Sequence, residues 1–303
     1  HPAILRRIAA GRPIIGNPPE VLRSVRRWKL LFSDLRRAGF MVPETILPRD
    51  GRRLDDKRRW LKKPLRSGGG HGVAFYQGDK FAGHQFMLQE YIPGRPCSAS
   101  FVANGRACVL LGISEQLVGM HQFGSYDFRY CGNILPIRAA SDSGALAAVL
   151  EQAEQLAAHV THRYGLVGVN GIDFILQDRQ VWPIEINPRY SASMELIEQA
   201  YDLPVFDLHA RAVLEGELPD FDLRAEISDR AFFGKAILYA EKAAVAPDTS
   251  RWRSRGIRDI PATGERLLRN GPVCTILANK GSFEETLEDL IRRAAALKEE
   301  IYA

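Results

Sequence analysis

The spacing of apolar residues predicts where the helices of this chain lie. Apolar side chains recur every three or four positions across residues 21–38, and Gly39 follows, which predicts one helix that ends there. Ser282 with Glu285 three residues later forms a capping box, the signal for the start of a final helix. The same spacing predicts further helices over residues 144–164, 192–200 and 204–214.

Shorter apolar runs with turn residues between them predict strands. Asn104-Gly105 separates two such runs and is a strong hairpin signal. The chain is therefore expected to be α+β, with substantial antiparallel sheet. The expected strands cover residues 60–63, 73–76, 87–92, 98–103, 107–111, 172–177, 181–187, 231–239 and 273–278.

Composition narrows the class of protein. With 303 residues, 46% hydrophobic and 25% charged, the chain can bury a large core in two or three subdomains, and wholesale disorder or a coiled coil is excluded. No apolar run reaches the roughly 18 residues of a membrane span, so no membrane partner is expected. The 4 cysteines lack a CxxC pair, which favours free thiols and a cytoplasmic location.

The charge is unevenly distributed. Residues 1–66 hold 18 Lys and Arg against 6 Asp and Glu, whereas the rest of the chain holds 23 against 30. A basic segment of this kind suits nucleic acid, an anionic ligand or a solvated helical face. No aromatic-interleaved basic surface or nucleic-acid reading motif accompanies it, so nucleic acid is not expected.

A glycine-rich loop is the first segment with chemical content. Ser67 is followed by Gly68, Gly69, Gly70 and, after one histidine, Gly72, and backbone N–H groups without a neighbouring Cβ can approach an anion closely. A strand-like run follows rather than a helix, which excludes a P-loop. A loop between two strands suits a lid over nucleotide phosphates, with Lys63 at its base; an ordinary hairpin loop is the alternative.

Two carboxylates occupy the predicted hairpin over residues 172–187. A short turn would pair Gln177 with Val181 and thereby set Asp173 opposite Glu185. Alternation places Asn187 on the same face, and like charges opposite each other destabilise a sheet unless something compensates. The other face would be core, formed by Phe174, Leu176, Trp182, Ile184 and Ile186.

These three oxygen-bearing side chains suit Mg²⁺, or Mn²⁺, bridged to substrate phosphates. Arg189 keeps the same parity and could neutralise a transferring phosphoryl group. The alternative is a solvent-facing polar strand without a metal. A separate Gly- and aromatic-rich loop with Arg129, Tyr130 and Asn133 is a candidate substrate segment.

The ordered set of motifs resembles the ATP-grasp superfamily over about residues 15–215. It consists of Lys63 with the glycine loop, the run from Gln89 to Gly94, and Asp173 with Glu185 to Arg189. The resemblance is strongest to the branch with biotin carboxylase and carbamoyl-phosphate synthetase, and the tail after residue 259 is similar to a subgroup of predicted ATP-dependent carboligases.

The resemblance implies a role for each matching residue. Lys29, Lys63 and the loop from Ser67 to Gly72 would contact the phosphates of ATP. Glu90 would accept the adenine amino group, and the backbone of Tyr91 and Ile92 would contact the adenine edge. Asp173, Glu185 and Asn187 would hold Mg²⁺, and Arg189 and Lys63 would be the catalytic residues.

Two departures from the family pattern stand out. Arg95-Pro96-Cys97 replaces the acidic residue that many relatives use to hold the ribose. Only a short segment precedes Lys29, so residues 1–20 are interpreted as the remnant of an N-terminal domain. The resemblance then divides the chain into an ATP-grasp domain over residues 21–218, in which residues 58–112 form the lid, and a β-rich extension with a helix over 219–303.

The predicted function is that of an ATP-dependent ligase. A small-molecule carboxylate would attack the γ-phosphate of MgATP, and an amine or similar nucleophile would then displace phosphate from the acyl phosphate. A kinase-type phosphotransferase and a nucleotide-binding regulatory protein without turnover are the alternatives. A homo-oligomer is compatible with the resemblance.

Overall fold

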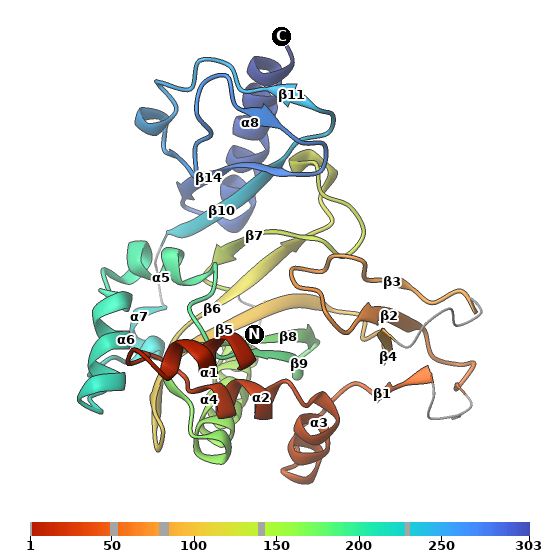
Figure 1. The fold of residues 1–303 in the computed structure, drawn as a ribbon, viewed down its shortest axis with the longest axis vertical. Coiled ribbons are helices and arrows are strands. Elements are labelled where there is room, and N and C mark those ends of the chain that lie inside the picture. The colour runs from red at the N-terminus through yellow and green to blue at the C-terminus, as the bar shows by residue number, and fades with distance from the viewer. Residues whose placement is uncertain (1, 49–53, 79–84, 139–142, 228–230) are drawn as a thin grey trace. The chain divides into compact units, whose positions relative to one another are not determined.

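The computed structural model describes residues 2–48, 54–78, 85–138, 143–227 and 231–303, and the mixed α and β class expected from the sequence is confirmed (Figure 1). The chain divides into two compact units. The first unit contains residues 1–43, 92–115 and 136–230, and the second contains residues 44–91, 116–135 and 231–303. None of the helices in the described ranges has the length and apolar content that crossing a bilayer requires.

The first unit is built on antiparallel strands in the order β6-β5-β8-β9. These strands are β5 (Arg95–Asn104), β6 (Cys108–Val118, which leaves this unit after Glu115), β8 (Val167–Gln177) and β9 (Gln180–Asn187). Its helices are α1 (Pro2–Ala9), α2 (Pro19–Val25), α3 (Trp28–Arg37), α4 (Ser143–Tyr164), α5 (Met194–Tyr201), α6 (Val205–Leu214) and α7 (Leu223–Glu226).

The helix predicted over residues 21–38 is two helices. The helical path is interrupted between α2 and α3, where Arg26 ends the first helix and Arg27 precedes the second with a ψ of 67°. Apolar spacing runs through the break because Val25 and Leu31 both face the core. Periodicity alone therefore could not locate it.

Helix α3 is joined to α4 by an ionic cluster around Asp34. Its carboxylate accepts hydrogen bonds from Arg163 (3.1 Å) and Tyr164 (3.2 Å) and lies 3.2 Å from Nε2 of His159. Arg163 holds down the pKa of Asp34 against the opposing effect of its burial. The sequence showed no acidic neighbour for His159, because its partner lies 125 residues away along the chain.

A buried polar network fastens the N-terminal segment to the hairpin of β8 and β9. Asn17 donates through Nδ2 to Oδ1 of Asn170 (2.7 Å) and to the carbonyls of Val167 (3.0 Å) and Pro188 (3.2 Å). Its Oδ1 accepts the Val167 N–H at 2.9 Å. Asn17 thus holds the segment from Asn187 to Arg189 at the end of β9, although it lies 171 residues before Pro188 in the chain.

His209 of α6 makes a second connection to the N-terminal segment. Its Nδ1 accepts the Val169 N–H at 3.0 Å, so the ring proton lies on Nε2, which donates to the Ile15 carbonyl at 3.1 Å. Gly168 has a φ of +66°, and a Cβ there would lie 2.4 Å from Nδ1 of His209. Only glycine lets the ring reach the start of β8.

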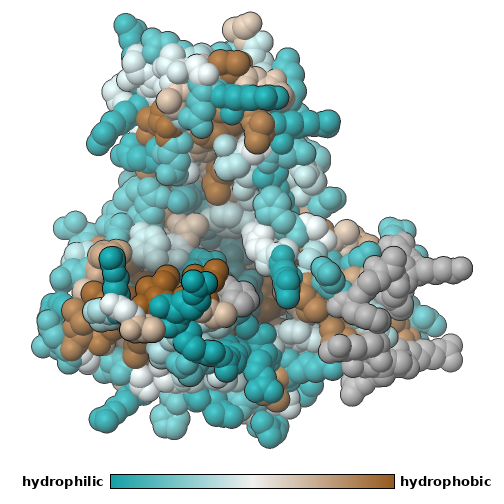
Figure 2. Space-filling model, viewed as in Figure 1, coloured by the Kyte–Doolittle hydropathy of each residue, from teal (hydrophilic) through white to brown (hydrophobic). Residues whose placement is uncertain are grey.

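The apolar side of α1 is not covered within the described residues. None of its side chains is buried, and Ile4 and Ile8 are 58% and 47% exposed. Figure 2 shows hydrophobic surface among hydrophilic residues in this part of the first unit.

The strands of the second unit pair antiparallel in the orders β1-β4-β2-β3, β7-β10-β14-β12 and β11-β13. Its strands are β1 (Thr45–Ile46), β2 (Trp60–Pro64), β3 (Ala74–Phe75), β4 (Phe86–Glu90), β7 (Tyr130–Leu135), β10 (Phe232–Tyr239), β11 (Ala244–Val245), β12 (Ile257–Arg258), β13 (Arg266–Leu267) and β14 (Pro272–Lys280). Its helices are the 3₁₀ turns η2 (His121–Phe123) and η3 (Arg253–Arg255) and the long helix α8 (Phe283–Tyr302).

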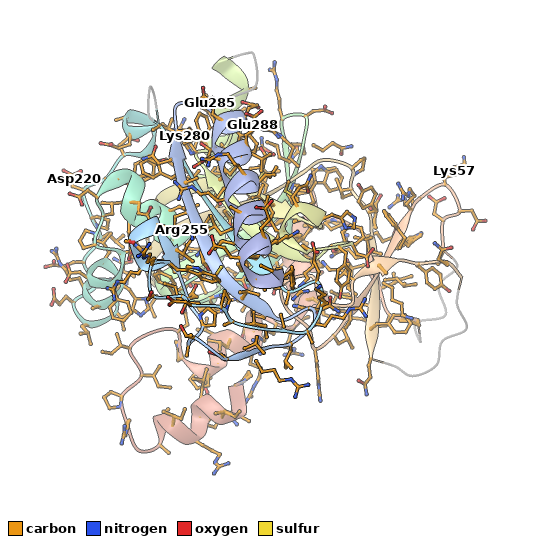
Figure 3. The ribbon with its side chains drawn as sticks, turned by 90° about the horizontal axis from the view of Figure 1, so that it is seen from above. Lys57, Asp220, Arg255, Lys280, Glu285 and Glu288 are labelled. Atoms are coloured by element: carbon orange, nitrogen blue, oxygen red, sulfur yellow. The ribbon has the colours of Figure 1, made fainter. Side chains whose placement is uncertain are left out.

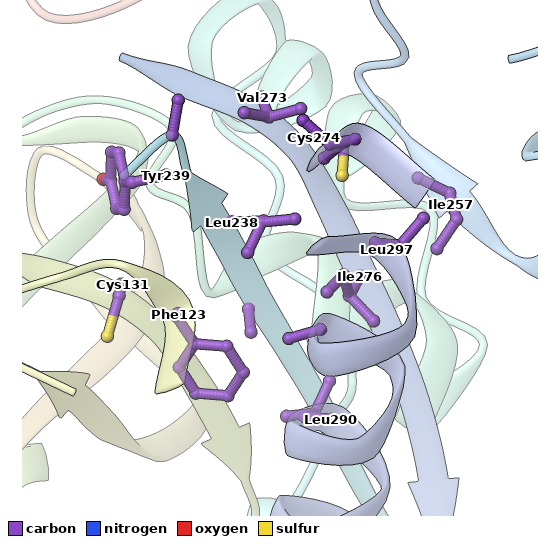
Figure 4. Close-up of a cluster of buried hydrophobic side chains, with 14 of the residues drawn as sticks. Phe123, Cys131, Leu238, Tyr239, Ile257, Val273, Cys274, Ile276, Leu290 and Leu297 are labelled. Carbon is purple, nitrogen blue, oxygen red and sulfur yellow. The ribbon is translucent and has the colours of Figure 1, made fainter. Parts of the chain in front are cut away.

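Helix α8 covers one face of β10 and β14. The Ser282 side chain caps its start by accepting the Glu285 N–H at 3.2 Å, as the capping box predicts. Leu290 and Leu297 of the helix are buried with Leu238 and Ile276 of the strands in one hydrophobic cluster (Figure 4). Lys280, Glu285 and Glu288 lie at the same end of this layer, where β14 passes into the helix (Figure 3).

The cysteines are free thiols, as expected. Cys97 in the first unit and Cys131 and Cys274 in the second are buried, and burial raises the pKa of each thiol.

Replacing Asn17 tests the network that holds the end of β9. We expect Asn17→Ala to lower the free energy of unfolding by about 2–3 kcal/mol, because it leaves buried carbonyl and N–H groups without partners. Urea denaturation measures the change. Ser24→Ala, which removes an exposed hydrogen bond to the Glu20 carbonyl, is the control and should cost about 0.5 kcal/mol or less. Equal effects of the two substitutions would contradict this view of Asn17.

Candidate functional site

The predicted carboxylate pair exists in the first unit. Asp173 on β8 lies directly opposite Glu185 on β9 and, on its other side, opposite Ser98 on β5. Glu185 is exposed, Asp173 is partly buried, and Ser98 is buried. Three adjacent strands thus present two carboxylates and a hydroxyl in one row.

A β-bulge produces this pairing. The turn pairs Gln177 with Gln180 rather than with Val181 as predicted, and the register shifts between Asp173 and Phe174 so that Ile184 is the extra residue. The bulge restores Glu185 to its place opposite Asp173. The predicted partner of Gln177 was wrong, whereas the predicted pairing of the carboxylates is confirmed.

The same bulge changes the face of the hairpin on which Trp182 lies. Trp182 pairs with Ile175, and Val181 pairs with Leu176. Val181 therefore lies on the core face, and Trp182 lies on the face of Asp173, contrary to the sequence prediction. Simple alternation fails here because one residue has been inserted into β9.

Asn187 and Arg189 extend the cluster beyond the pair. Asn187 donates through Nδ2 to Oδ2 of Asp173 at 3.0 Å, and its Oδ1 accepts from Nη2 of Arg189 at 3.2 Å. Gly171 lies opposite Asn187 and has no side chain, which leaves room for the amide to reach Asp173. Arg189 is exposed and also donates to the Tyr190 carbonyl at 3.0 Å.

The local electrostatics favour a cation. Burial and the neighbouring charge of Glu185 raise the pKa of Asp173 to about 6, although Ser98, Arg189 and Asn187 act in the opposite direction. A bound cation would stabilise the ionised pair. Among the described residues, however, no group of three or more His, Cys, Asp or Glu side chains converges, and the metal ligands Asp173, Glu185 and Asn187 stay a prediction.

The glycine loop belongs to the second unit and connects β2 with β3. Ser67 donates through Oγ to the His71 carbonyl at 2.6 Å, which closes the loop on itself. Gly69, Gly70 and Gly72 have φ values of +61°, +75° and +72°. At Gly70 an added Cβ would lie 1.8 Å from the Phe128 carbonyl oxygen, so only glycine permits this approach.

Lys63 stands at the base of that loop, as the sequence suggests. Its Nζ donates to Oε1 of Gln89 at 2.9 Å, and Gln89 in turn donates to Oγ1 of Thr45 at 3.2 Å. Gln89 is buried, so the amide fixes the position of the lysine. Sequence reasoning missed this role of Gln89.

The carboxylate of Glu90 takes part in an ion-pair cluster of the second unit. Its Oε2 accepts from Nη1 of Arg58 and from the N–H of Glu44, both at 3.0 Å. Arg58 also pairs with Glu44 at 3.1 Å and with Asp55 at 3.2 Å. No sequence motif marks Arg58, because it lies 32 residues from Glu90.

The chain passes from the second unit to the first between Tyr91 and Ile92. The Tyr91 N–H donates to the Arg59 carbonyl at 2.8 Å. Its ring contacts Phe75 and Phe128, with centroids 5.1 and 6.3 Å apart. The Tyr91 N–H is therefore occupied within the second unit. A contact of the Tyr91 backbone with adenine stays a prediction, and it would have to use the carbonyl.

The candidate substrate residues occupy the start of β7 in the second unit. The Tyr130 hydroxyl bonds to Oδ1 of Asn133, and Asn133 is buried opposite Lys235 of β10. Arg129 is also buried and stacks on the ring of Tyr239.

Lys29 is exposed near the start of α3 in the first unit. Its Nζ lies 5.6 Å from the centre of the Trp28 ring. The first unit thus brings together Asp173, Glu185, Asn187 and Arg189, and it also carries Lys29 and Ile92. The second unit carries the glycine loop, Lys63, Glu90, Tyr91 and the substrate candidates Arg129, Tyr130 and Asn133.

A sequence profile of the ATP-grasp domain matches residues 27–193. The match covers the glycine loop, the segment around Tyr91 and the carboxylate hairpin. The family expected from the ordered motifs is therefore confirmed.

An uncharacterized protein of the archaeon Methanocaldococcus jannaschii is 24% identical over 282 residues, which are 88% of this chain and 64% of that protein. The chain therefore spans less than two thirds of the length of this relative.

Solved structures of low sequence identity share the fold. The L-amino acid ligase from Bacillus licheniformis matches with a TM-score of 0.70 and 17% identity, over 99% of this chain and 77% of that one. The biotin carboxylase domain of 2-oxoglutarate carboxylase from Hydrogenobacter thermophilus, solved with the magnesium salt of ADP and with bicarbonate, matches with a TM-score of 0.71 and 14% identity, over 97% and 70% of the two chains.

Replacing Asp173 tests the electrostatic cost of the pair. Its folded pKa of about 6 lies above the ordinary 3.8, so the folded state binds the proton more tightly and the free energy of unfolding falls as pH rises between these values. Asp173→Asn should therefore stabilise the metal-free chain by about 1–2 kcal/mol near pH 7.5, below the limit of about 3 kcal/mol for a two-unit shift. The gain should vanish below about pH 4.

Urea denaturation in a chelator at several pH values measures this difference. Asp178→Asn, in the exposed turn of the same hairpin, is the control, and its stability relative to the parent should change little with pH. A loss of stability in Asp173→Asn near neutral pH would contradict the predicted cost of burying this carboxylate beside Glu185.

Proposed function

Because the chain belongs to the ATP-grasp family, we propose that it is an ATP-dependent ligase that joins a small-molecule carboxylate to an amine or similar nucleophile. The observation that carries this proposal is the row of Asp173 and Glu185 with Asn187 and Arg189 beside it. A nucleotide-binding protein without turnover would gain nothing from a like-charged pair held in register.

The proposed reaction has two steps. A carboxylate oxygen of the substrate attacks the γ-phosphorus of ATP, the bond to the bridging oxygen breaks, and ADP leaves with that electron pair. The amine then attacks the acyl carbon, phosphate leaves, and the amine loses a proton. Both steps depend on positioning and charge neutralisation, for which lysine, arginine and a divalent cation are suited.

The residues of the first unit are suited to the charged end of this reaction. Asp173 and Glu185 supply carboxylate oxygens for Mg²⁺ or Mn²⁺, and a turn of the Asn187 amide would add a third oxygen. The cation would neutralise phosphate charge when bound. Arg189 is exposed beside Asn187, and in our proposal its guanidinium stabilises the acyl phosphate.

The residues of the second unit are suited to the nucleotide. The glycine loop and Lys63 would contact its phosphates. Oε1 of Glu90 accepts no hydrogen bond from the described residues, and in our proposal it accepts the adenine amino group. Of the substrate candidates, Tyr130 carries a hydroxyl at the start of β7, where it bonds to the buried amide of Asn133.

Replacing Glu185 tests the role of the hairpin. We expect Glu185→Gln to lower Mg²⁺-dependent ADP release by about 100-fold or more, because one anionic oxygen donor is lost. The assay uses pools of carboxylates and amines. Asp178→Asn makes the same change of charge in the turn and should retain the parental rate.

Hydroxylamine trapping distinguishes the reaction classes. A hydroxamate formed together with ADP supports the acyl phosphate and therefore the ligase. ADP release with a phosphorylated acceptor and no hydroxamate would instead identify a phosphotransferase. Parental turnover in Glu185→Gln would refute the proposed role of this carboxylate.

A further inference from the structure

Arg129 is a buried cation with an incomplete set of hydrogen bonds. Its side chain lies just before β7 and the residue is 4% exposed. Nη2 donates to the Asn270 carbonyl at 2.6 Å, whereas Nε and Nη1 are buried without a hydrogen-bond partner among the described residues. Burial of a charge in this way is costly.

The ring of Tyr239 compensates part of this cost. The guanidinium carbon lies 3.4 Å from the ring centre, a close cation–π contact. Tyr239 itself lies at the end of β10 (Figure 4). An apolar side chain would fill the same space without burying a charge. The guanidinium therefore serves more than packing: it attaches its own backbone to Tyr239 and Asn270.

The backbone of Arg129 is fixed from the other side as well. Its carbonyl accepts the Gly119 N–H at 2.8 Å and the Ser125 hydroxyl at 2.9 Å, and its N–H donates to the Tyr126 carbonyl at 3.1 Å. Side chain and backbone together hold the three residues 128–130, which we call the docking segment, at one position in the second unit.

The glycine loop rests on this docking segment. The Tyr130 N–H donates to the Gly69 carbonyl at 3.0 Å. Gly70 approaches so closely that an added Cβ would lie 1.8 Å from the Phe128 carbonyl oxygen and 3.2 Å from Cα of Arg129. The Phe128 ring also contacts Phe75, which follows the loop on β3, with centroids 5.3 Å apart.

We propose that Arg129 is a positioning residue for the glycine loop: by anchoring the docking segment to Tyr239 and Asn270, it holds the loop in the position that receives the phosphates of ATP. This inference rests on the proposed function for the identity of the ligand. Arg129 acts through the docking segment and touches no nucleotide, so it is not a catalytic residue.

The expected effect follows from the population of the docked loop. If only the docked loop binds phosphates, the apparent affinity for ATP falls by the fraction of the protein that is docked. If loss of the guanidinium lowers the docked fraction to about one tenth, the KM for ATP should rise about tenfold. The kcat should change by about twofold or less, because ATP at saturation restores the docked loop.

Hydrogen exchange tests the docking directly and needs no turnover. In the full chain, Arg129→Met should accelerate amide exchange in peptides that cover residues 64–76 and 119–131 and leave the α8 peptide, residues 283–302, unchanged. Arg129→Lys should restore part of the protection, because lysine keeps a cation over Tyr239 and a donor for Asn270. Lys242→Met is the matched control, since it removes a cation 4.9 Å from the Tyr302 ring in the same unit.

A second variant disrupts the same contact by a change in the glycine loop. Gly70→Ala places a methyl group against the Phe128 carbonyl and should accelerate exchange in the same two peptides while Arg129 is intact. The double variant Arg129→Met with Gly70→Ala should exchange little faster than either single variant, because both break one contact. Unchanged exchange at residues 64–76 in Arg129→Met, or equal acceleration in every peptide, would overturn the proposal.

Steady-state kinetics with ATP separate this inference from the proposed function. A tenfold rise in KM at nearly constant kcat in Arg129→Met, partly reversed in Arg129→Lys, supports the positioning role. A fall in kcat with an unchanged KM overturns it. Absence of ATP turnover in the parent chain would refute the proposed function alone, and the exchange experiment would still decide whether Arg129 positions the loop.

Discussion

Burial of one carboxylate directly opposite another is the constraint on which the carboxylate cluster of the first unit depends. Asp173 and Glu185 lie opposite each other on adjacent strands, and the pairing of β8 with β5 and β9 fixes the backbone of Asp173 on both sides. Burial, and after it the charge of Glu185, raises the pKa of Asp173 although Ser98, Arg189 and Asn187 act in the opposite direction, so these neighbours compensate only part of the cost. Sites that a fold retains at such a cost are commonly functional, and a bound cation would reverse the sign of the interaction.

Two polar residues beside the hairpin, the buried Asn17 and the half-buried His209, hold it in place. Asn17 bonds to the carbonyl of Pro188, and His209 ties the start of β8 to the N-terminal segment. The hydrogen bonds of both anchors reach backbone groups of β8, and Asn17 also bonds to the Asn170 side chain, so together they favour one arrangement of the strands. The position of Arg189 thus depends on residues that no ligand would touch.

Much of the fold and of the carboxylate cluster could be predicted from the sequence, because alternation and turn residues are local signals. The capped start of α8 follows from such signals, and the family was recognised from the order of the motifs. The opposition of Asp173 and Glu185 was predicted from a turn register that is wrong by one residue, and the bulge cancels that error. The bulge at Ile184 could not be predicted, since a one-residue insertion leaves no trace in composition. The ion pair of Arg58 with Glu90 and the contact of Gly70 with Phe128 join distant segments, and pairings of that kind are decided by packing.

The buried cysteines allow local unfolding to be measured in each unit. Cys97 belongs to the first unit and Cys131 and Cys274 to the second, and their raised pKa values leave little thiolate to react with a reagent. Reaction therefore requires the surrounding structure to open, so the rate of thiol labelling measures local unfolding rather than surface exposure. Labelling followed by mass spectrometry would resolve the stability of the two units separately, without introducing new cysteines into the chain.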